Sequence, residues 1–346
     1  MAPRIAIIGD NFMLPEIFAE AIAAASPATP DMALHRLPWP DEPMEHGYAI
    51  QGMDGLKEYQ GSAEATLAMI GEADLLVTHL APLSRDMFGQ LPRLKFVAVS
   101  RGGPVNIDMG AARQRGIVVV NTPGRNASAV AEFTLGAILA ETRNISRGHD
   151  ALRGGDWRGD LYRADTTGRE LSEMTVGVVG YGAIGTRVVR LLKAFGCKIL
   201  VADPYVQLSS QDARDGVELV ALERLLSESD VVTLHARVTE ETTGFIDAAA
   251  LARMKPDATL INTARGPLLD YDALTEVLGR GHLRGAMLET FAVEPVPDDW
   301  PLLRLPNVTL TPHIAGASLK TVKIAADQAA EEVRRYLAGE PPVNPC

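Results

Sequence analysis

Short apolar runs alternate along the chain with longer stretches in which apolar residues recur at helical spacing. The runs are rich in β-branched residues and fall into two groups, which is typical of βαβ units and of parallel sheets covered by helices. The sequence therefore predicts an α/β fold with two doubly wound parallel sheets. The expected strands are 4–8, 74–78, 95–99 and 117–120 in the first group, and 175–179, 198–202, 230–234, 258–262, 285–288 and 308–310 in the second.

Two long helical patterns accompany these strands. The first covers 126–145, between the two groups, with Asn126 or Ser128 as its N-cap. The second covers 318–338, where Ser318 could cap the start and Gly339 ends the helix. Its expected apolar stripe consists of Val322, Ala326, Ala329, Val333 and Leu337. The Pro-rich stretch 38–43 is interpreted as a surface loop.

Composition places the chain among ordinary globular proteins. It has 346 residues, of which 47% are hydrophobic and 22% charged, and this length suggests about two domains. The net charge of -11 argues against a nucleic-acid or anionic-membrane surface. Cys197 and Cys346 form no metal or redox motif and suit a reducing compartment. No apolar run is long enough for a membrane span and no signal-peptide core precedes the first strand, so we expect a cytoplasmic protein.

A glycine-rich turn follows the first strand of the second group. "TVGVVGYGAIG" places Gly180, Gly182 and Gly185 between a strand and a helical run, as in a dinucleotide-binding turn. Gly180 permits the tight turn, Gly182 lets the backbone approach a pyrophosphate, and Gly185 permits close packing of helix on strand. The next strand ends in Asp203, which would accept hydrogen bonds from ribose hydroxyls and repel a 2′-phosphate. The pattern therefore favours NAD over NADP as cofactor.

Three polar residues each follow a strand of the second group: Arg265 in "NTARGP", Glu294 in "LETFAVEPVP" and His313 in "LTPHIAG". Ligands of open α/β sheets bind at the carboxyl ends of the strands, where these side chains would gather. Arg265 could hold a carboxylate and polarise a carbonyl through its planar fork of donors. His313 could supply or accept a proton near neutral pH, and Glu294 could orient it and raise its pKa. These roles predict hydride transfer between a 2-hydroxy acid and a 2-keto acid.

The same motifs make the sequence similar to the D-isomer-specific 2-hydroxyacid dehydrogenases, which include phosphoglycerate, hydroxypyruvate/glyoxylate and D-lactate dehydrogenases. The resemblance is carried by "NTPGRNASAVAEFTLGAIL", "VGVVGYGAIG", "SDVVTLHARVTEETTGFID", "MKPDATLINTARGPLLDYDAL" and "LTPHIAG". It implies a flavodoxin-like substrate domain from both chain ends, 1–122 plus 313–346, and a Rossmann domain at 123–312. It also implies a homodimer and the roles given above to Arg265, Glu294 and His313.

The resemblance extends to the remaining site residues. The residues it places against the cofactor are Gly180, Tyr181, Gly182, Ala183, Ile184, Gly185, Asp203, His235, Ala236, Arg237, Thr263, Ala264 and Glu289. The substrate would contact Arg101, Gly102, Gly103, Arg265 and His313; no metal is implied. The family's substrate loop holds the carboxylate by backbone amides of a Gly-x-Gly, and the corresponding "SRGGPVNID" is about two residues shorter.

Two further positions depart from the family. Glu289 stands where the family has Asp near the nicotinamide amide, and Glu is one methylene longer. Arg237 stands where the family often has Pro near the adenosine, and an arginine there could contact a 2′-phosphate. NAD stays favoured, with NADP not excluded.

The substrate itself stays open. Loops 9–15 and 78–84 contribute candidates for specificity, and Arg101 or Arg125 could supply a charge that binds a substrate phosphate. The loop candidates are Asn11, Phe12, Met13, His79 and Leu80. Two other functions remain alternatives: an NAD(H)-sensing, corepressor-like binding protein on the same fold, and a dehydrogenase of the formate or phosphite type.

Overall fold

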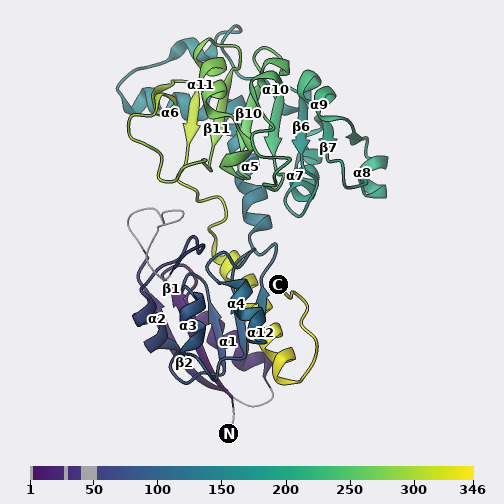
Figure 1. The fold of residues 1–346 in the computed structure, drawn as a ribbon. Helices are drawn as coiled ribbons and strands as arrows, with labels where there is room; N and C mark the ends of the chain where they lie inside the picture. Colours follow the sequence, from purple (N-terminus) through teal and green to yellow (C-terminus); the bar gives the residue numbers. More distant parts are fainter. Residues whose placement is uncertain (1–2, 27–29, 40–52) are drawn as a thin grey trace. The chain divides into compact units, whose positions relative to one another are not determined.

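The computed structural model describes residues 3–26, 30–39 and 53–346. The chain forms two compact units: residues 1–126 with 317–346 make up unit 1, and residues 127–316 make up unit 2 (Figure 1). Unit 1 therefore contains both ends of the chain. The boundaries lie four residues further along the chain than those expected from the sequence, at 122/123 and 312/313.

Unit 1 is built on a parallel sheet with the strand order β2-β1-β3-β4-β5. This is the flavodoxin-like order of a doubly wound sheet, in which the strand order reverses between β1 and β3. The strands are β1 (Arg4–Asp10), β2 (Asp31–Leu37), β3 (Leu75–Thr78), β4 (Phe96–Val99) and β5 (Val118–Asn121). The helices are α1 (Pro15–Ala25), α2 (Ala63–Ile70), α3 (Arg85–Gly89), α4 (Met109–Gln114) and α12 (Leu319–Leu337).

Both faces of this sheet are covered, so its strands are apolar on both sides. On β1, Ala6 and Ile8 belong to the cluster that packs under α2, α3 and α4. The alternate residues Ile5 and Ile7 belong to the cluster formed with α1 and α12. This two-residue alternation explains why the first strand is a nearly continuous apolar run.

Unit 2 contains a parallel sheet with the strand order β12-β11-β10-β9-β6-β7-β8. The order reverses between β6 and β9, as in dinucleotide-binding folds. The strands are β6 (Thr175–Val179), β7 (Lys198–Ala202), β8 (Glu218–Leu219), β9 (Val231–Leu234), β10 (Thr259–Asn262), β11 (Gly285–Leu288) and β12 (Val308–Leu310). The helices are α5 (Ala127–Thr142), α6 (Ile145–Arg153), α7 (Gly185–Leu192), α8 (Ser210–Arg214), α9 (Leu222–Glu228), α10 (Ala248–Arg253) and α11 (Tyr271–Gly279). Short 3₁₀ segments lie at Gly159–Tyr162, Leu171–Glu173, Lys193–Phe195, Gly266–Leu268 and Pro301–Arg304.

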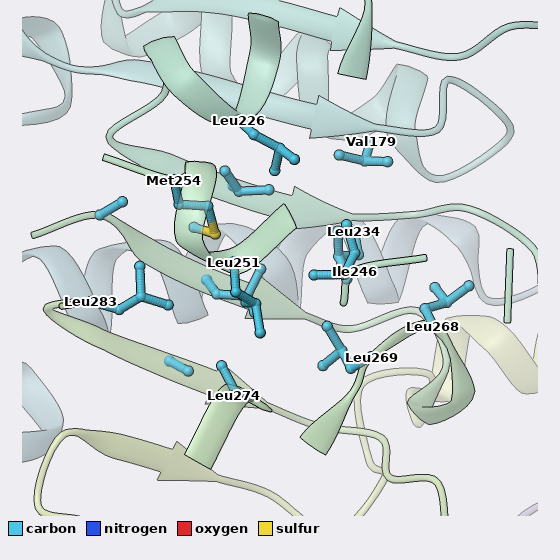
Figure 2. Packing of buried hydrophobic residues seen from close by; sticks show 14 of the residues in the cluster. Val179, Leu226, Leu234, Ile246, Leu251, Met254, Leu268, Leu269, Leu274 and Leu283 are labelled. Carbon is cyan, nitrogen blue, oxygen red and sulfur yellow. The ribbon is translucent and has the colours of Figure 1, made fainter. Parts of the chain in front are cut away.

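The core of unit 2 again has two layers, one on each face of the sheet. Figure 2 shows the layer under α9, α10 and α11, where Leu226, Leu251 and Leu274 point toward strand residues such as Leu234. On the other face, α5 and α7 pack on the sheet, and Ile261 of β10 contributes there. The helices on both faces therefore hold the strands of the sheet in place.

Most expected elements agree with the structure, and the exceptions have simple physical causes. The sequence analysis missed β2 and β8, because β2 is an edge strand with alternating exposed positions and β8 has only two residues. The helix expected over 126–145 ends at Thr142, and Asn144 adopts a left-handed conformation before α6 begins. In the expected loop 38–43, only residues 38 and 39 lie within the described part, where they have no regular structure.

Helix α12 begins at the residue that the sequence indicates. The Ser318 side chain accepts a hydrogen bond from the amide of Thr321 at 3.1 Å. Val322, Ala326 and Val333 are buried against the sheet, but Leu337 at the end of the stripe is 38% exposed, contrary to expectation. Among the described residues of the chain, no helix is long and apolar enough to cross a lipid bilayer.

The cap gives a test of this helix. Replacing Ser318 by Ala should lower the free energy of unfolding by about 1 kcal/mol, because the Thr321 amide loses its acceptor. Urea unfolding followed by circular dichroism measures the change. The control Ser318→Asp keeps a capping oxygen and should remain close to the original protein. An unchanged midpoint in the Ala variant would show that the cap contributes nothing.

Candidate active site

The glycine turn after β6 has the geometry that a bound pyrophosphate requires. Gly180 has a φ of 95°, and a Cβ there would lie 2.7 Å from the backbone nitrogen of Ala236. A Cβ on Gly185, at the start of α7, would lie 2.0 Å from the Gly180 carbonyl oxygen. At Gly182 a Cβ would have no neighbour within 4 Å, so the backbone is open to a ligand. The turn therefore fits a dinucleotide whose phosphates face the N-terminus of α7.

Asp203, one residue past β7, is fixed by two backbone amides. Its Oδ2 accepts a hydrogen bond from the amide of Tyr181 at 2.9 Å, and its Oδ1 accepts one from the amide of Tyr205 at 3.0 Å. The carboxylate is half-buried, so it remains accessible at the end of the strand. This is the position from which an acid binds ribose hydroxyls in dinucleotide-binding folds. Ala183 in the turn is exposed and Ile184 is half-buried.

The segment after β9 contains a buried histidine and an exposed arginine. His235 shares a hydrogen bond of 3.0 Å between its Nε2 and the Thr233 hydroxyl, whereas its buried Nδ1 has no partner. Burial lowers the pKa of His235 to about 3, so the ring is neutral at physiological pH. Arg237, two residues further, is exposed. An unpaired buried ring nitrogen is consistent with a ligand that completes this part of the site.

The predicted site residues of unit 2 all lie along one edge of its sheet. Every strand of the sheet is parallel, so the residues that follow the strands meet at the carboxyl edge. In sheet order this edge carries His313 after β12, Glu289 after β11, Thr263–Arg265 after β10, His235–Arg237 after β9, the glycine turn after β6 and Asp203 after β7. The structure thus brings the predicted catalytic and cofactor residues of this unit to a single edge.

The Glu294 carboxylate and the His313 imidazole form a hydrogen-bonded pair. Glu294 Oε2 and His313 Nδ1 are 2.8 Å apart, and Glu294 Oε1 accepts a hydrogen bond from the Phe291 amide at 2.8 Å. The glutamate is therefore fixed at both oxygens, and only 12% of its side chain is exposed. The His313 side chain is 41% exposed. With Nδ1 engaged, Nε2 is the ring atom that can meet a substrate.

Arg265 is exposed at the end of β10, and its backbone is held by Asn262. The Asn262 side chain donates to the Arg265 carbonyl oxygen at 3.0 Å and accepts from the Ala264 amide at 3.1 Å. The next residue, Gly266, fits tightly against the loop after β11, since a Cβ on it would lie 1.9 Å from the carbonyl carbon of Phe291. The loop carrying Arg265 therefore packs directly on the loop whose Phe291 amide binds Glu294.

Glu289 is a buried carboxyl group at the end of β11. Its Oε1 accepts a hydrogen bond from the Ala315 amide at 2.7 Å, and its carbonyl oxygen accepts one from the His313 amide at 3.0 Å. Burial raises the pKa of Glu289 to about 7. Glu289 thus binds the amides of both His313 and Ala315, in a segment where His313 adopts a left-handed φ of 53°.

The nearby Thr263 is buried and its hydroxyl lies 2.7 Å from that of Thr134 on α5. Ala264 is buried as well, and Ala236 is half-buried. Among the residues that the structure describes, no cluster of His, Cys, Asp or Glu could hold a metal ion.

The predicted substrate residues of unit 1 lie after β4. The Arg101 guanidinium forms an ion pair with the Glu58 carboxylate and also donates to the Glu58 carbonyl oxygen at 2.8 Å. The Gly102 carbonyl oxygen accepts a hydrogen bond from Asn121, and a Cβ on Gly102 or Gly103 would meet nothing within 4 Å. The two glycines are therefore open to a ligand, whereas Arg101 is already paired.

Two loop candidates for specificity are in the wrong place. Met13 and Leu80 are both fully buried in unit 1, so neither can face a substrate. Both loops turn back into the core soon after the strand, and residues 78–84 are all buried. Asn11 is exposed and Phe12 half-buried, while His79 is buried beside Asp10.

Sequence reasoning missed three residues that shape these sites: Asn262, Phe291 and Asp10. The Asn262 side chain bonds to the backbone of Arg265, and the Phe291 amide bonds to Glu294. No local sequence pattern predicts either of these hydrogen bonds. Asp10 did carry a signal, because a carboxylate follows the apolar run 5–8 at the end of the strand, and the structure buries it completely. A buried carboxylate at a strand end indicates a partner and can be sought in the sequence.

Comparison with known proteins agrees with this geometry. The family described as D-isomer specific 2-hydroxyacid dehydrogenase, NAD binding domain, matches residues 135–315, slightly more than half of the chain. A glyoxylate reductase of Korarchaeum cryptofilum is 38% identical over 284 residues, which cover 82% of this chain and 85% of that protein. A D-3-phosphoglycerate dehydrogenase of Mycobacterium tuberculosis is 40% identical over 275 residues, covering 79% of this chain but 51% of that protein. The chain thus spans about half the length of the mycobacterial relatives.

Solved structures show the same two-domain architecture. The TT0316 protein from Thermus thermophilus matches with a TM-score of 0.78 and 30% identity, covering 99% of both chains. A D-2-hydroxyisocaproate dehydrogenase matches with a TM-score of 0.79 and 27% identity, over 98% of this chain and 99% of that one. The chain belongs to the D-isomer-specific 2-hydroxyacid dehydrogenase family. It is an oxidoreductase with an NAD-binding domain.

The buried carboxyl of Glu289 gives a pH-dependent stability that can be measured. Its folded pKa of about 7 exceeds the usual 4.5, so its stabilising contribution is complete below pH 4.5 and is lost as the pH rises through 7. Between pH 4.5 and 8, the free energy of unfolding should fall by about 3 kcal/mol more in the original protein than in Glu289→Gln. The glutamine keeps an acceptor for the Ala315 amide.

Urea unfolding at the two pH values measures this difference. The control Glu276→Gln changes an exposed carboxylate on α11 and should retain the pH dependence of the original protein. Equal pH dependence in Glu289→Gln and the original protein would mean that Glu289 titrates like an exposed acid.

Proposed function

We propose that this protein interconverts a D-2-hydroxy acid and a 2-keto acid, with NAD as cofactor and with Arg265, His313 and Glu294 as the catalytic residues. The observation that carries the proposal is the 2.8 Å pair of Glu294 and His313 on the same sheet edge as the glycine turn. An acid–base pair beside a dinucleotide site matches the needs of alcohol–ketone interconversion. When bound, NAD supplies or accepts the hydride.

Arg265 binds the anionic substrate and polarises its carbonyl group. A guanidinium presents parallel donors in a geometry that matches a carboxylate. The hydrogen bonds of Asn262 to the surrounding backbone hold the start of this loop in one conformation. A fixed cation also stabilises the negative charge that develops on the carbonyl oxygen.

His313 moves the proton. In reduction of a keto acid, Nε2 of the protonated ring donates its proton to the substrate oxygen, while Nδ1–H stays on Glu294. In the opposite direction, Nε2 accepts the proton of the alcohol. Glu294 is held by the Phe291 amide, so it fixes the ring orientation in both protonation states. The pair thus acts as general acid and general base in turn.

The cofactor is held by the residues along the sheet edge. Gly180, Gly182 and Gly185 would accommodate the pyrophosphate, Asp203 would bind the ribose hydroxyls, and Glu289 would lie near the nicotinamide end. The remaining contacts come from Tyr181, Ala183, Ile184, His235, Ala236, Arg237, Thr263 and Ala264. Asp203 favours NAD; exposed Arg237 is the residue through which NADP would be accepted.

In unit 1, we propose that the substrate carboxylate binds the backbone amides of Gly102 and Gly103. Neither amide donates a hydrogen bond to another described residue, and both positions lack close neighbours. Arg101, already paired with Glu58, would act by holding this loop.

We further propose that the protein is a homodimer formed through the segment around α6. This segment of unit 2 exposes several large apolar side chains that a monomer would leave in water. The exposed fractions are 58% for Ile145, 59% for Leu152, 82% for Trp157 and 95% for Tyr162. Aromatic residues are enriched in protein interfaces, and a second copy of the chain would cover them.

We also propose a cytoplasmic location, because Cys197 and Cys346 are both free thiols and suit a reducing compartment.

Oxidation of NADH in the presence of 2-keto acids tests the reaction. The panel contains glyoxylate, hydroxypyruvate, pyruvate, 2-ketoglutarate and phosphohydroxypyruvate, with NADPH in parallel and with formate and phosphite plus NAD as separate assays. Turnover of a keto acid supports the proposal. Turnover of formate or phosphite alone would indicate a dehydrogenase of the formate or phosphite type. NADH binding without any turnover would favour an NAD(H)-sensing, corepressor-like binding protein.

Replacing Arg265 by Gln should lower kcat/KM roughly 100- to 1000-fold, because the substrate loses its charged partner. The dissociation constant of NADH, measured by fluorescence, should change less than about twofold. The control Arg280→Gln removes an exposed arginine at the end of α11 and should leave both values unchanged. Full activity in Arg265→Gln would remove Arg265 from the mechanism.

Light scattering should give the mass of a dimer. The variant Trp157→Glu places a charge in the exposed apolar segment and should shift the protein toward the monomer. Trp39→Glu, an equally drastic change in unit 1, should leave the mass unchanged. A monomeric original protein would overturn the dimer.

A further inference from the structure

The Tyr181 side chain belongs to the glycine turn of unit 2, yet it is buried. Tyr181 is 6% exposed and packs in the apolar cluster on the face of the sheet that α5 and α7 cover. The two residues that follow it, Gly182 and Ala183, are exposed. The turn therefore presents its backbone to a ligand, while the tyrosine ring enters the interior of the unit.

The hydroxyl group of Tyr181 ends at a buried carboxylate. It donates a hydrogen bond to Oδ2 of Asp212, a residue of α8 that is 8% exposed. The other oxygen, Asp212 Oδ1, accepts a hydrogen bond from Lys193 Nζ at 2.6 Å. Lys193 directly follows α7 and also pairs with Asp215 at 2.7 Å. One carboxylate thus joins the tyrosine of the turn, the end of α7 and α8.

The backbone amide of Tyr181 holds the acid to which the ribose is assigned. It donates to Asp203 Oδ2 at 2.9 Å, and the Tyr205 amide donates to Oδ1 at 3.0 Å. Asp203 is the first residue of the segment 203–212, and Asp212 is the last. Tyr181 therefore binds this segment at its start through its amide and at its end through its hydroxyl group.

The middle of the segment is anchored as well. Val206 and Leu208 pack against the same apolar cluster as Tyr181. The Ser209 side chain caps α8 by accepting a hydrogen bond from the Asp212 amide at 3.1 Å. A segment attached at both ends and in the middle has little conformational freedom, so the carboxylate at its start keeps one position.

Asp203 can bind a ligand without losing these contacts. A carboxylate oxygen has about two acceptor sites, and each oxygen of Asp203 accepts one backbone amide from the described residues. The half-buried carboxylate can therefore receive the two ribose hydroxyls in addition. Because a group that is already oriented binds its ligand at a lower entropic cost, what fixes Asp203 also determines how tightly it binds the ribose.

We propose that Tyr181 is a positioning residue of the cofactor site: its hydroxyl bond to Asp212 and its amide bond to Asp203 together fix the acid that binds the adenosine ribose. This inference rests on the proposed role of Asp203 and extends it to two side chains that act through it. Tyr181 then meets the cofactor with its backbone only. A Tyr181–Asp212 bond that served stability alone would leave the affinity for the ribose unchanged when it is removed.

Calorimetric titration of ADP-ribose, which contains the adenosine ribose and lacks the nicotinamide, tests the proposal on the full-length protein. Tyr181→Phe removes the hydroxyl group and keeps the amide. It should raise the dissociation constant of ADP-ribose roughly 5- to 10-fold, because Asp203 is no longer held in one orientation. If keto acids are turned over, KM for NADH should rise by the same factor, and kcat should change less than about twofold.

A double-mutant cycle separates positioning from stability. In the Asp203→Ala background, Tyr181→Phe should change the affinity for ADP-ribose less than about twofold. The matched control Tyr271→Phe removes another buried hydroxyl bond of unit 2, to the Thr290 carbonyl oxygen at 2.8 Å, and should leave this affinity unchanged. Circular dichroism checks folding, and Asp212→Ala, which removes the same bond from the other side, replaces Tyr181→Phe if the latter does not fold.

Unchanged ADP-ribose affinity in Tyr181→Phe, or equal weakening with and without the Asp203 carboxylate, would overturn the proposal. Absence of ADP-ribose binding to the original protein would overturn it as well, together with the ribose role of Asp203. Failure of the reaction is a separate outcome. If no keto acid is turned over, weaker ADP-ribose binding in Tyr181→Phe that disappears in the Asp203→Ala background would still support the positioning role.

Discussion

The hydrogen bond from the Ala315 amide to the buried carboxyl of Glu289 connects the sheet of unit 2 to the segment that carries His313. Glu289 belongs to the end of β11, whereas His313 follows β12 at the edge of the sheet. Together with the hydrogen bond from the His313 amide to the Glu289 carbonyl oxygen, this contact holds the segment in which His313 has a left-handed backbone. The contact fixes the ring that Glu294 then orients. The position of the hydrogen-bonded Glu294–His313 pair therefore depends on a buried carboxyl group at the end of β11.

The general architecture could be predicted because its causes are local. Strands covered on both faces are apolar throughout, and β6, β7, β11 and β12 have the limits that the sequence indicates. The edge strand β2 escaped notice because only one of its residues is buried. Gly180 and Gly185 could be assigned because backbone geometry requires glycine there.

The finer features of the sites could not be predicted, since they depend on contacts between loops. Nothing in the sequence places Gly266 against Phe291, and this contact joins the loops of Arg265 and Glu294. The pairing of Arg101 with Glu58 spans 43 residues and changes the part that Arg101 can play. Likewise, only the three-dimensional structure shows that Met13 and Leu80 enter the core.

Unit 1 is assembled from the two ends of the chain, and this has a consequence for biosynthesis. Helix α12 covers the α1 face of the first sheet, and the last residues pair with its edge, where the Cys346 amide donates to the Val119 carbonyl oxygen at 2.9 Å. On the ribosome, β1 to β5 emerge long before these covering segments. For most of translation the nascent chain therefore presents an open sheet edge and an uncovered apolar face, which are the features that chaperones bind. The residues of unit 2, in contrast, are continuous in sequence, so all of its strands and helices have been synthesised before α12.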